Sequence, residues 1–326
     1  MNVASTTGNK SLEVITLSDG KSLAAEILPF GAIIKSIKFN NQEMTLCVNE
    51  PAYYLENPFY LGATVGRYAN RIENGRFVLS GTEYQLKANN GPNSLHGGEK
   101  GFNKVLWQVT KQSNNEVELY YCSADGEEGF PGQLQVWQTI TARNGELILS
   151  YKAITDKETL VNFTNHCYFN LEGSESINNH LLQINTATYL PIDSNSIPLV
   201  HHEDGSGSCF DFTHPKPIGD ALCAQHAQLD AGSGFDHCYI FSDDNRLKTM
   251  ATLTSPHTGV NLTLKSTQPG MQLYTANFVG SPFKACQAVC LEAQNWPNAA
   301  NRSDYPKANL LPNEEYSQQI IFAFSQ

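Results

Sequence analysis

Short runs of alternating apolar and polar residues recur along the chain, and each of them predicts a β-strand. Residues 23–28 and 32–39 form two early runs. Residues 134–142 and 146–154 flank Asn144-Gly145, a dipeptide that favours the tight turn of a β-hairpin. Turn signals return at short intervals through the rest of the chain. The pattern therefore predicts consecutive antiparallel strands packed as a sandwich, with no alternation of strands and helices.

The pattern also bears on domain organisation. No segment has the apolar period of a helix longer than two turns, and neither a repeat nor a low-complexity linker interrupts the chain. The length of 326 residues suggests two domains by a simple rule, but all-β chains of this size often form one. Since no shift in composition marks a boundary, we predict a single domain over residues 1–326.

One stretch departs from the strands around it. Residues 161–171, Val-Asn-Phe-Thr-Asn-His-Cys-Tyr-Phe-Asn-Leu, alternate like a strand but place amides, a hydroxyl and an imidazole among aromatic residues. Polar side chains on a buried strand cost free energy unless they find partners. His166, with Asn165 and Asn170 nearby, is therefore a candidate for a concave polar site. The alternative is a core histidine that neighbouring amides satisfy.

The charge of the chain narrows the choice of partners. Lys and Arg number 21 against 32 Asp and Glu, which gives a net charge of −11. Nucleic acid and anionic membrane surfaces are therefore unfavourable partners, and a phosphorylated substrate is disfavoured. No apolar run is long enough to span a bilayer. Abundant Asn and Gln suit hydroxyl-rich ligands, although ordinary acidic solubility also accounts for the net charge.

The cysteines and the first residues suggest a compartment. None of the 8 cysteines forms a Cys-x-x-Cys pair, and no spacing typical of a zinc site occurs. Residues 1–10 lack the apolar core of a secretory leader. We therefore expect free thiols in a reducing cytoplasm and no metal or cofactor. His201-His202-Glu203-Asp204 is interpreted as a solvated loop, because no partner spacing supports a metal there.

Further polar residues occur at positions where a plain β protein would favour apolar ones. Glu292 is a carboxylate on a short apolar strand, which is costly unless the group is used or paired. Gln272 stands among apolar neighbours, and Asp236 lies where a strand begins after a glycine hinge. His96 directly precedes two glycines, so the backbone there can approach a ligand closely. A surface loop histidine is the alternative for His96.

Taken together, these segments resemble the aldose 1-epimerase (galactose mutarotase) family. The resemblance extends in family order from about Ala24 to the C-terminus. It is carried by Gly-Arg-Tyr-Ala-Asn-Arg-Ile at 66–72, Leu-His-Gly-Gly at 95–98, Asp-Gly-Glu-Glu-Gly-Phe-Pro-Gly at 125–132, Thr-Asn-His-Cys-Tyr-Phe-Asn-Leu at 164–171, Phe-Asp-His at 235–237, Gln-Pro-Gly-Met-Gln-Leu-Tyr at 268–274 and Cys-Leu-Glu-Ala-Gln at 290–294.

The resemblance implies an all-β fold, a large antiparallel β-sandwich of the galactose mutarotase-like supersandwich type with an open sugar-binding cleft. It implies a small aldose as substrate, in a monomer or homodimer that needs no cofactor. His166 would be the general acid on the ring oxygen, Glu292 the general base on the anomeric hydroxyl, and His96 an assistant near the ring oxygen. The implied sugar-binding residues are Asn70, Arg71, His96, Asp236 and Gln272.

Interconversion of anomers fits these residue types, because opening and reclosing a hemiacetal ring needs one acid and one base. With ordinary pKa values, Glu292 would set the acidic limb of the pH profile and His166 a limb near or above neutrality. Ala276 and Ala293 differ from the family's usual Gly and Thr. The resemblance implies that both adjoin the site, which leaves the preferred sugar open. The rival hypotheses are a non-catalytic sugar-binding module, a glycoside hydrolase using Glu292 and Asp236, and a hexose-6-phosphate mutarotase.

Overall fold

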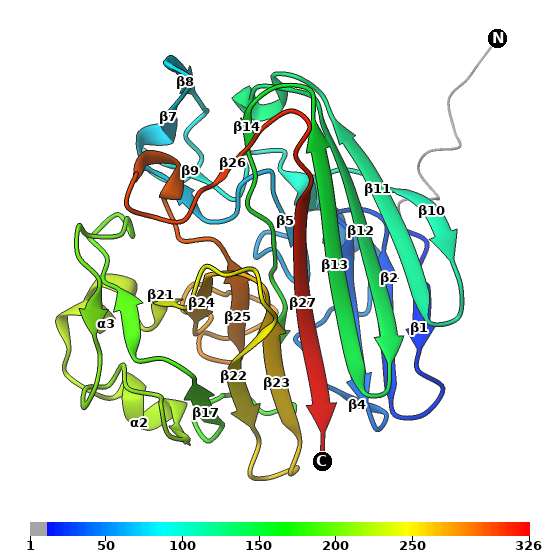
Figure 1. The fold of residues 1–326 in the computed structure, drawn as a ribbon. Coiled ribbons are helices and arrows are strands. Elements are labelled where there is room, and N and C mark those ends of the chain that lie inside the picture. The colour runs from blue at the N-terminus through cyan, green and yellow to red at the C-terminus, as the bar shows by residue number, and fades with distance from the viewer. Residues whose placement is uncertain (1–11) are drawn as a thin grey trace.

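A computed structural model describes residues 12–326, so residues 1–10, with their predicted lack of an apolar leader, lie outside the described part. A nine-stranded antiparallel sheet forms the largest layer (Figure 1). Its order is β10 (Gln108–Gln112), β11 (Glu116–Ser123), β12 (Leu134–Arg143), β13 (Glu146–Thr155), β27 (Tyr316–Ser325), β23 (Asn261–Ser266), β22 (Lys248–Thr254), β17 (Leu181–Ile184) and β20 (Lys216–Pro217).

Two smaller antiparallel sheets accompany it. One has six strands in the order β16 (Tyr168–Phe169), β25 (Val289–Gln294), β24 (Gly270–Tyr274), β21 (Asp236–Ile240), β18 (Thr188–Leu190) and β19 (Glu203–Asp204). The other has four, β1 (Ile15–Ser18), β2 (Leu23–Leu28), β3 (Ile33–Phe39) and β4 (Gln42–Glu43). Four two-stranded pairs are β14 (Thr159–Leu160) with β26 (Asn309–Leu310), β15 (Thr164–Asn165) with β5 (Thr64–Val65), β6 (Arg71–Ile72) with β9 (Ser94–Leu95), and β7 (Arg76–Leu79) with β8 (Thr82–Gln85).

The predicted all-β class is confirmed. In residues 12–326 the α-helices are α2 (Ile218–Leu222) and α3 (Ala227–Gly232), both shorter than two turns. Neither is long enough to cross a membrane. The predicted hairpin turn is present, because Asn144 and Gly145 have φ values of 53° and 78° and join β12 directly to β13. Side chains of β12 alternate between buried positions and half-buried or exposed ones, as the sequence pattern requires.

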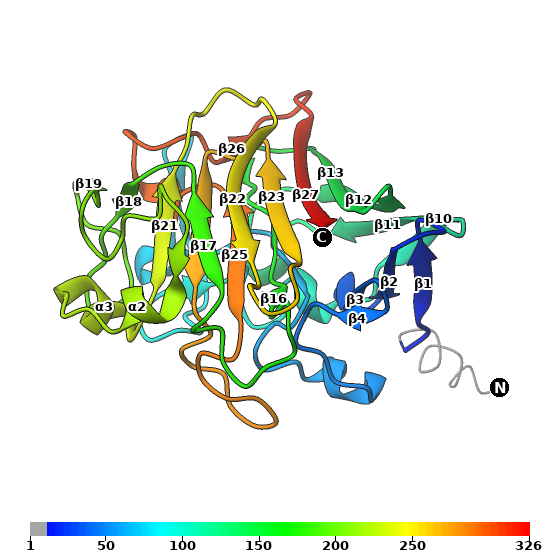
Figure 2. The ribbon, with the colours of Figure 1, turned by 90° about the horizontal axis from the view of Figure 1, so that it is seen from below.

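The six-stranded sheet has one face in the main core and the other toward a cleft. Leu291 of β25 and Leu273 of β24 belong to the same buried cluster as Phe322 of β27 and Leu264 of β23. In Figures 1 and 2, β22 and β23 of the large sheet run beside β25. Because side chains alternate along a strand, the neighbours of Leu291 and Leu273 point the other way. The residues on that second face are the polar ones.

The stretch at 161–171 does not form the single strand that its alternation predicts. It contains only β15 and β16, and His166 and Cys167 lie between them. β15 pairs with β5, whereas β16 pairs with β25, so the chain passes here from one sheet to another. Every residue of the stretch is buried, which removes the exposed face that an alternating strand would have. The crossing is what brings the imidazole of His166 to β25.

The segment 201–204 was interpreted as a solvated loop. All four of its residues are exposed, but Glu203 and Asp204 form the edge strand β19 beside β18. The hydroxyl of Tyr189 donates to Glu203 Oε2 at 2.8 Å, which accounts for one carboxylate of the cluster.

Candidate active site

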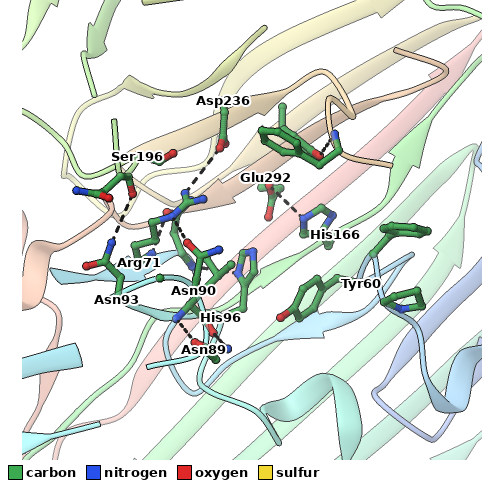
Figure 3. A pocket seen from close by; sticks show the side chains of 18 of the residues that line it. Tyr60, Arg71, Asn89, Asn90, Asn93, His96, His166, Ser196, Asp236 and Glu292 are labelled. Carbon is green, nitrogen blue, oxygen red and sulfur yellow. Dashed lines mark hydrogen bonds and ion pairs between the residues drawn. The ribbon is translucent and has the colours of Figure 1, made fainter. Parts of the chain in front are cut away.

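A cleft of about 600 Å³ lies on the polar face of the six-stranded sheet. The predicted site residues that line it are Asn70, Arg71, His96, His166, Asp236 and Glu292. They come from segments far apart in the chain, and those labelled in Figure 3, namely Arg71, His96, His166, Asp236 and Glu292, point into one space. Gln272 lies behind this wall and donates from Nε2 to Asp236 Oδ1 at 2.7 Å. It therefore acts on the cleft through Asp236.

His166 and Glu292 form a close buried pair at the floor of the cleft. His166 Nε2 lies 3.8 Å from Glu292 Oε1, and the two side chains are 5% and 2% exposed. The distance is too long for a hydrogen bond, so both atoms remain available to a third group between or beside them (Figure 3). Glu292 Oε2 has no hydrogen-bond partner within residues 12–326. The pair can therefore accept a proton from one atom of a bound ligand and donate a proton to a neighbouring atom.

Burial shifts the proton affinities of this pair in opposite directions. Desolvation lowers the pKa of His166 to about 4, and the residue's own backbone carbonyl offsets only part of this. Desolvation raises the pKa of Glu292 well above its ordinary value; Asp236 adds to the increase and Arg71 opposes it. Both changes follow from the cost of holding a charge away from water. Burial thus favours neutral His166 beside protonated Glu292.

His96 is fixed by backbone contacts and has a defined tautomer. Its Nδ1 accepts a hydrogen bond from the backbone N–H of Asn70 at 3.2 Å. Burial keeps the pKa of His96 well below its usual range, so the ring is neutral and Nε2 carries the proton. His96 is therefore a hydrogen-bond donor in the cleft and is unsuited to hold a positive charge.

The two glycines after His96 have a different use from the one that the sequence suggests. His96 has φ of 53°, and Gly97 continues the turn at 84°. A Cβ on Gly97 would stand 2.1 Å from the carbonyl oxygen of Gly66. The close approach is therefore to the backbone of another loop, and neither Gly97 nor Gly98 lines the cleft. The glycines therefore serve the packing of two loops, while His96 itself lines the cleft.

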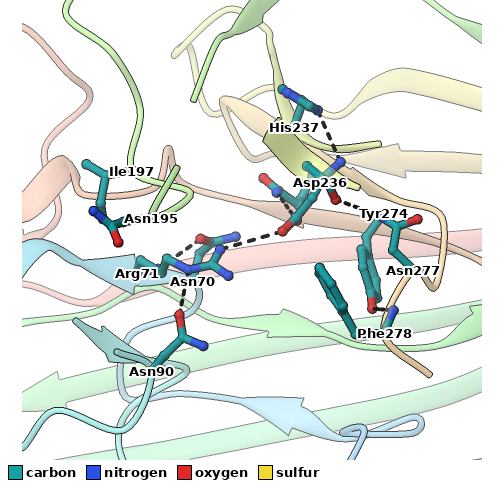
Figure 4. Close-up of polar contacts among 12 residues, drawn as sticks. Asn70, Arg71, Asn90, Asn195, Ile197, Asp236, His237, Tyr274, Asn277 and Phe278 are labelled. Carbon is teal, nitrogen blue, oxygen red and sulfur yellow. Dashed lines mark hydrogen bonds and ion pairs between the residues drawn. The ribbon is translucent and has the colours of Figure 1, made fainter. Parts of the chain in front are cut away.

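Arg71, Asp236 and their supports form one polar network along the cleft wall. Arg71 Nη1 lies 3.7 Å from Asp236 Oδ2, and its Nε donates to Asn90 Oδ1 at 3.0 Å (Figure 4). With Gln272 on the other oxygen, Asp236 is held on two sides. These contacts fix a guanidinium and a carboxylate side by side. Such a pair can donate to and accept from adjacent hydroxyl groups of one ligand.

Aromatic residues that the sequence reasoning did not single out surround the imidazole. The ring of His166 stacks on Tyr168 with centroids 4.9 Å apart and on Tyr60 at 5.9 Å. Tyr274 approaches it edge-on, and Phe278 stands at the rim with 64% of its surface exposed. Tyr168 lies inside the 164–171 segment and Tyr274 inside the 268–274 segment, so the motifs contained them. Tyr60 and Phe278 lie outside those segments.

The two departures from the family pattern do not lie in the cleft wall. Ala293 belongs to the main core on the opposite face of β25, and Ala276 belongs to a second buried cluster. Ala276 has φ of 54°, a conformation that glycine adopts more easily, which explains why glycine is usual there. The expectation that both positions adjoin the sugar is therefore not supported by the residues that line the cleft.

The fold and the site together define an antiparallel β protein with a buried imidazole–carboxylate pair at the floor of an open polar cleft. The family model described as Aldose 1-epimerase matches residues 13–323. The chain belongs to the aldose 1-epimerase family.

Curated relatives agree with this assignment. A galactose mutarotase of Sus scrofa is 39% identical over 318 residues, covering 93% of this chain and 91% of the relative. An aldose 1-epimerase of Escherichia coli K12 is 33% identical over 329 residues, covering 95% and 94%. A solved galactose 1-epimerase from Lactobacillus acidophilus NCFM superimposes with a TM-score of 0.88 at 30% identity, covering 99% of this chain and 97% of the other.

Proposed function

We propose that this protein is an aldose 1-epimerase that interconverts the α and β anomers of free aldohexoses such as galactose and glucose. Family membership and the curated relatives support the reaction. The observation that carries the assignment at atomic level is the buried pair of His166 and Glu292 in an open cleft. Anomer exchange needs one acid and one base that act on neighbouring oxygens, and this pair supplies both.

The proposed reaction uses the pair with its one proton on His166, so this proton first passes there from Glu292. Glu292 then takes the proton of the C1 hydroxyl while His166 gives its proton to the ring oxygen. The bond between C1 and the ring oxygen breaks, its electron pair stays on the ring oxygen, and C1 becomes an aldehyde. Rotation about the C1–C2 bond presents the other face of the carbonyl. The proton transfers then run in reverse and close the ring. No proton is gained or lost overall, so one proton on the pair suffices for every turnover.

The remaining cleft residues would bind the sugar. Arg71 and Asp236 meet adjacent hydroxyls, with Gln272 keeping Asp236 in place. His96 offers its Nε2–H to an oxygen near the ring oxygen, and Asn70 lines the cleft beside it. Holding the sugar in one orientation converts proton transfer into an effectively intramolecular step.

The structure also bears on the rival functions. A sugar-binding module needs the network around Arg71 but has no use for a buried acid–base pair with a 3.8 Å separation. A glycoside hydrolase needs Asp236 and Glu292 as its two carboxylates. Asp236 is instead engaged by Gln272 and Arg71, which leaves it poorly placed to exchange protons. Among the described lining residues, Arg71 is the single Lys or Arg, which argues against a phosphorylated hexose.

We further propose that residues 1–326 form one domain, that the protein acts in the cytoplasm, and that it is a monomer or homodimer. The family match over 13–323 supports a single domain. All 8 cysteines are free thiols, which suits a reducing compartment. Size-exclusion chromatography with light scattering would test the oligomeric state.

Polarimetry tests the proposed reaction. Freshly dissolved α-D-galactose and α-D-glucose should reach their equilibrium rotation faster with the protein than without it. An aryl galactoside should release no free sugar, because its anomeric oxygen carries no proton for Glu292 to take. Unchanged rotation with both sugars would overturn the proposal, and release from the aryl galactoside would favour hydrolysis.

A further inference from the structure

The imidazole of His166 has a second polar neighbour that the proposed reaction does not use. Cys290 Sγ lies 3.5 Å from His166 Nδ1, on the side of the ring away from the nitrogen that faces Glu292. Cys290 is fully buried and does not line the cleft. A bound sugar would therefore not touch this thiol, whose hydrogen-bonding contact among the described residues is with the imidazole of His166.

The register of the strands explains why the thiol and the carboxylate meet the same ring. Cys290 and Glu292 stand two residues apart on β25, so their side chains share one face. β16 pairs with β25 through Tyr168 and Cys290. This pairing holds His166, which stands two residues before Tyr168, over that face. One strand thus presents a thiol to Nδ1 and a carboxylate to Nε2. The arrangement follows from the backbone and does not depend on a mobile loop.

The chemical character of sulfur matters for an acid. When the imidazolium gives up its Nε2 proton, the ring keeps a proton on Nδ1. The partner of Nδ1 must then accept a hydrogen bond from that N–H. A thiol is a weak donor and a weak acceptor, so it stabilises the charged ring less than a carboxylate or hydroxyl would. The hydrogen bond at one ring nitrogen also sets which proton the other nitrogen carries.

We propose that Cys290 is a positioning residue for the general acid: its thiol holds the Nδ1 side of His166 so that Nε2 faces the sugar, and its weak acceptor strength makes the imidazolium a ready proton donor. This inference deepens the proposed function and rests on it.

Other groups packed against the ring do not replace this role. Glu292 faces Nε2, neutral His96 meets the ring edge-on, and the phenols of Tyr60, Tyr168 and Tyr274 contact its faces and edge. Desolvation raises the pKa of Tyr60 and of Tyr274, so these phenols stay uncharged at neutral pH. Desolvation likewise raises the pKa of Cys290, which remains a thiol.

The test compares the unmodified full chain with Cys290→Ser and Cys290→Ala. All three proteins are labelled with ¹⁵N at histidine. The hydroxyl of Cys290→Ser is a stronger partner, so the ring nitrogens of His166 should shift and titrate at higher pH. The midpoint of the acidic limb of kcat/KM should rise together with the titration of these nitrogens, by roughly half a pH unit or more. Cys290→Ala removes the partner, so kcat should fall by about 2–10-fold while KM stays unchanged. The His166 signals are identified by their loss in His166→Asn.

Cys238→Ser is the matched control, since Cys238 is also a buried thiol of the same sheet. Its Sγ donates to the backbone carbonyl of Tyr239 at 3.7 Å, and within residues 12–326 it has no hydrogen bond to an imidazole. Ring signals and pH profiles that are identical in all variants would overturn the proposal, and so would an equal change in Cys238→Ser. If the unmodified protein shows no mutarotation, the proposed function fails, and the ¹⁵N titration alone then decides whether Cys290 governs His166.

Discussion

At the residue scale, burial decides which protons the proposed catalytic pair, His166 and Glu292, holds. Ordinary pKa values would give an anionic Glu292 and a partly charged His166 at neutral pH. Desolvation instead lowers the pKa of His166 to about 4 and raises that of Glu292 well above its usual range. The pair therefore holds one proton over a wide range of pH. That single proton is the amount that the proposed reaction requires.

The pH dependence of kcat/KM should follow from these directions. As the pH falls through about 4, a second proton binds His166 and Glu292 can no longer accept one. As the pH rises through the raised pKa of Glu292, the last proton leaves and no acid remains. The sequence-based expectation assigned the two limbs the other way round. A rate profile by polarimetry that loses half its activity near pH 6.5 on the acidic side, at the ordinary pKa of histidine, would contradict this assignment.

At the scale of elements, the loops around the cleft depend on a buried arginine that does not touch it. Arg67 is 2% exposed and donates to the backbone carbonyls of Pro131, Gly132 and Ala124 at 3.0, 2.9 and 3.1 Å. The same loop holds Glu128, whose carboxylate accepts from the backbone N–H groups of Glu99 and Lys100, next to the turn that carries His96. Arg67 therefore supports His96 through two loops.

Arg67→Met should be strongly destabilising, because it leaves several buried carbonyl groups without a donor. We expect a loss of about 3 kcal/mol or more in the free energy of unfolding. Urea denaturation followed by tryptophan fluorescence would measure it. Arg76→Met is the control, since Arg76 makes an exposed ion pair with Glu83 that contributes at most about 1 kcal/mol. Equal effects of the two changes would show that Arg67 has no special structural role.

Most of the site residues could be identified from the sequence. Their arrangement, with one side chain packed behind another, could not. Local segments such as 164–171 contain both the reacting residue and its backbone setting, so His166 and His96 could be located from them. The position of Gln272 behind Asp236 depends on the pairing of β21 with β24, which no single segment encodes. The contact between Cys290 and His166 depends on the pairing of β16 with β25 in the same way. The broken strand at 161–171 was missed because alternation does not reveal a change of partner sheet.

Across the whole molecule acidic residues outnumber basic ones, and the cleft offers little free positive charge. The chain carries a net charge of −11, and Asp236 and Glu292 both line the cleft. Arg71 is the single Lys or Arg of the described lining, and it is already engaged by Asp236 and Asn90. A neutral sugar is little affected by the net negative charge, whereas a phosphate group would be repelled by it.

Glucose 6-phosphate should therefore be a poorer substrate than glucose. We expect its kcat/KM to be lower by about tenfold or more, a difference that added salt would reduce. Coupled assays of anomer exchange at low and moderate ionic strength would measure both effects. A preference for the phosphorylated sugar would favour the hexose-6-phosphate mutarotase alternative.

His166 and Glu292 are proposed to exchange protons with one bound sugar. The most direct measurement is polarimetry of α-D-galactose with His166→Asn and Glu292→Gln, paired with calorimetric titration of galactose binding. Because an amide cannot serve as acid or base, each variant should lose roughly 10²–10⁴-fold in turnover while still binding the sugar. Turnover near that of the unmodified protein in either variant would contradict the account.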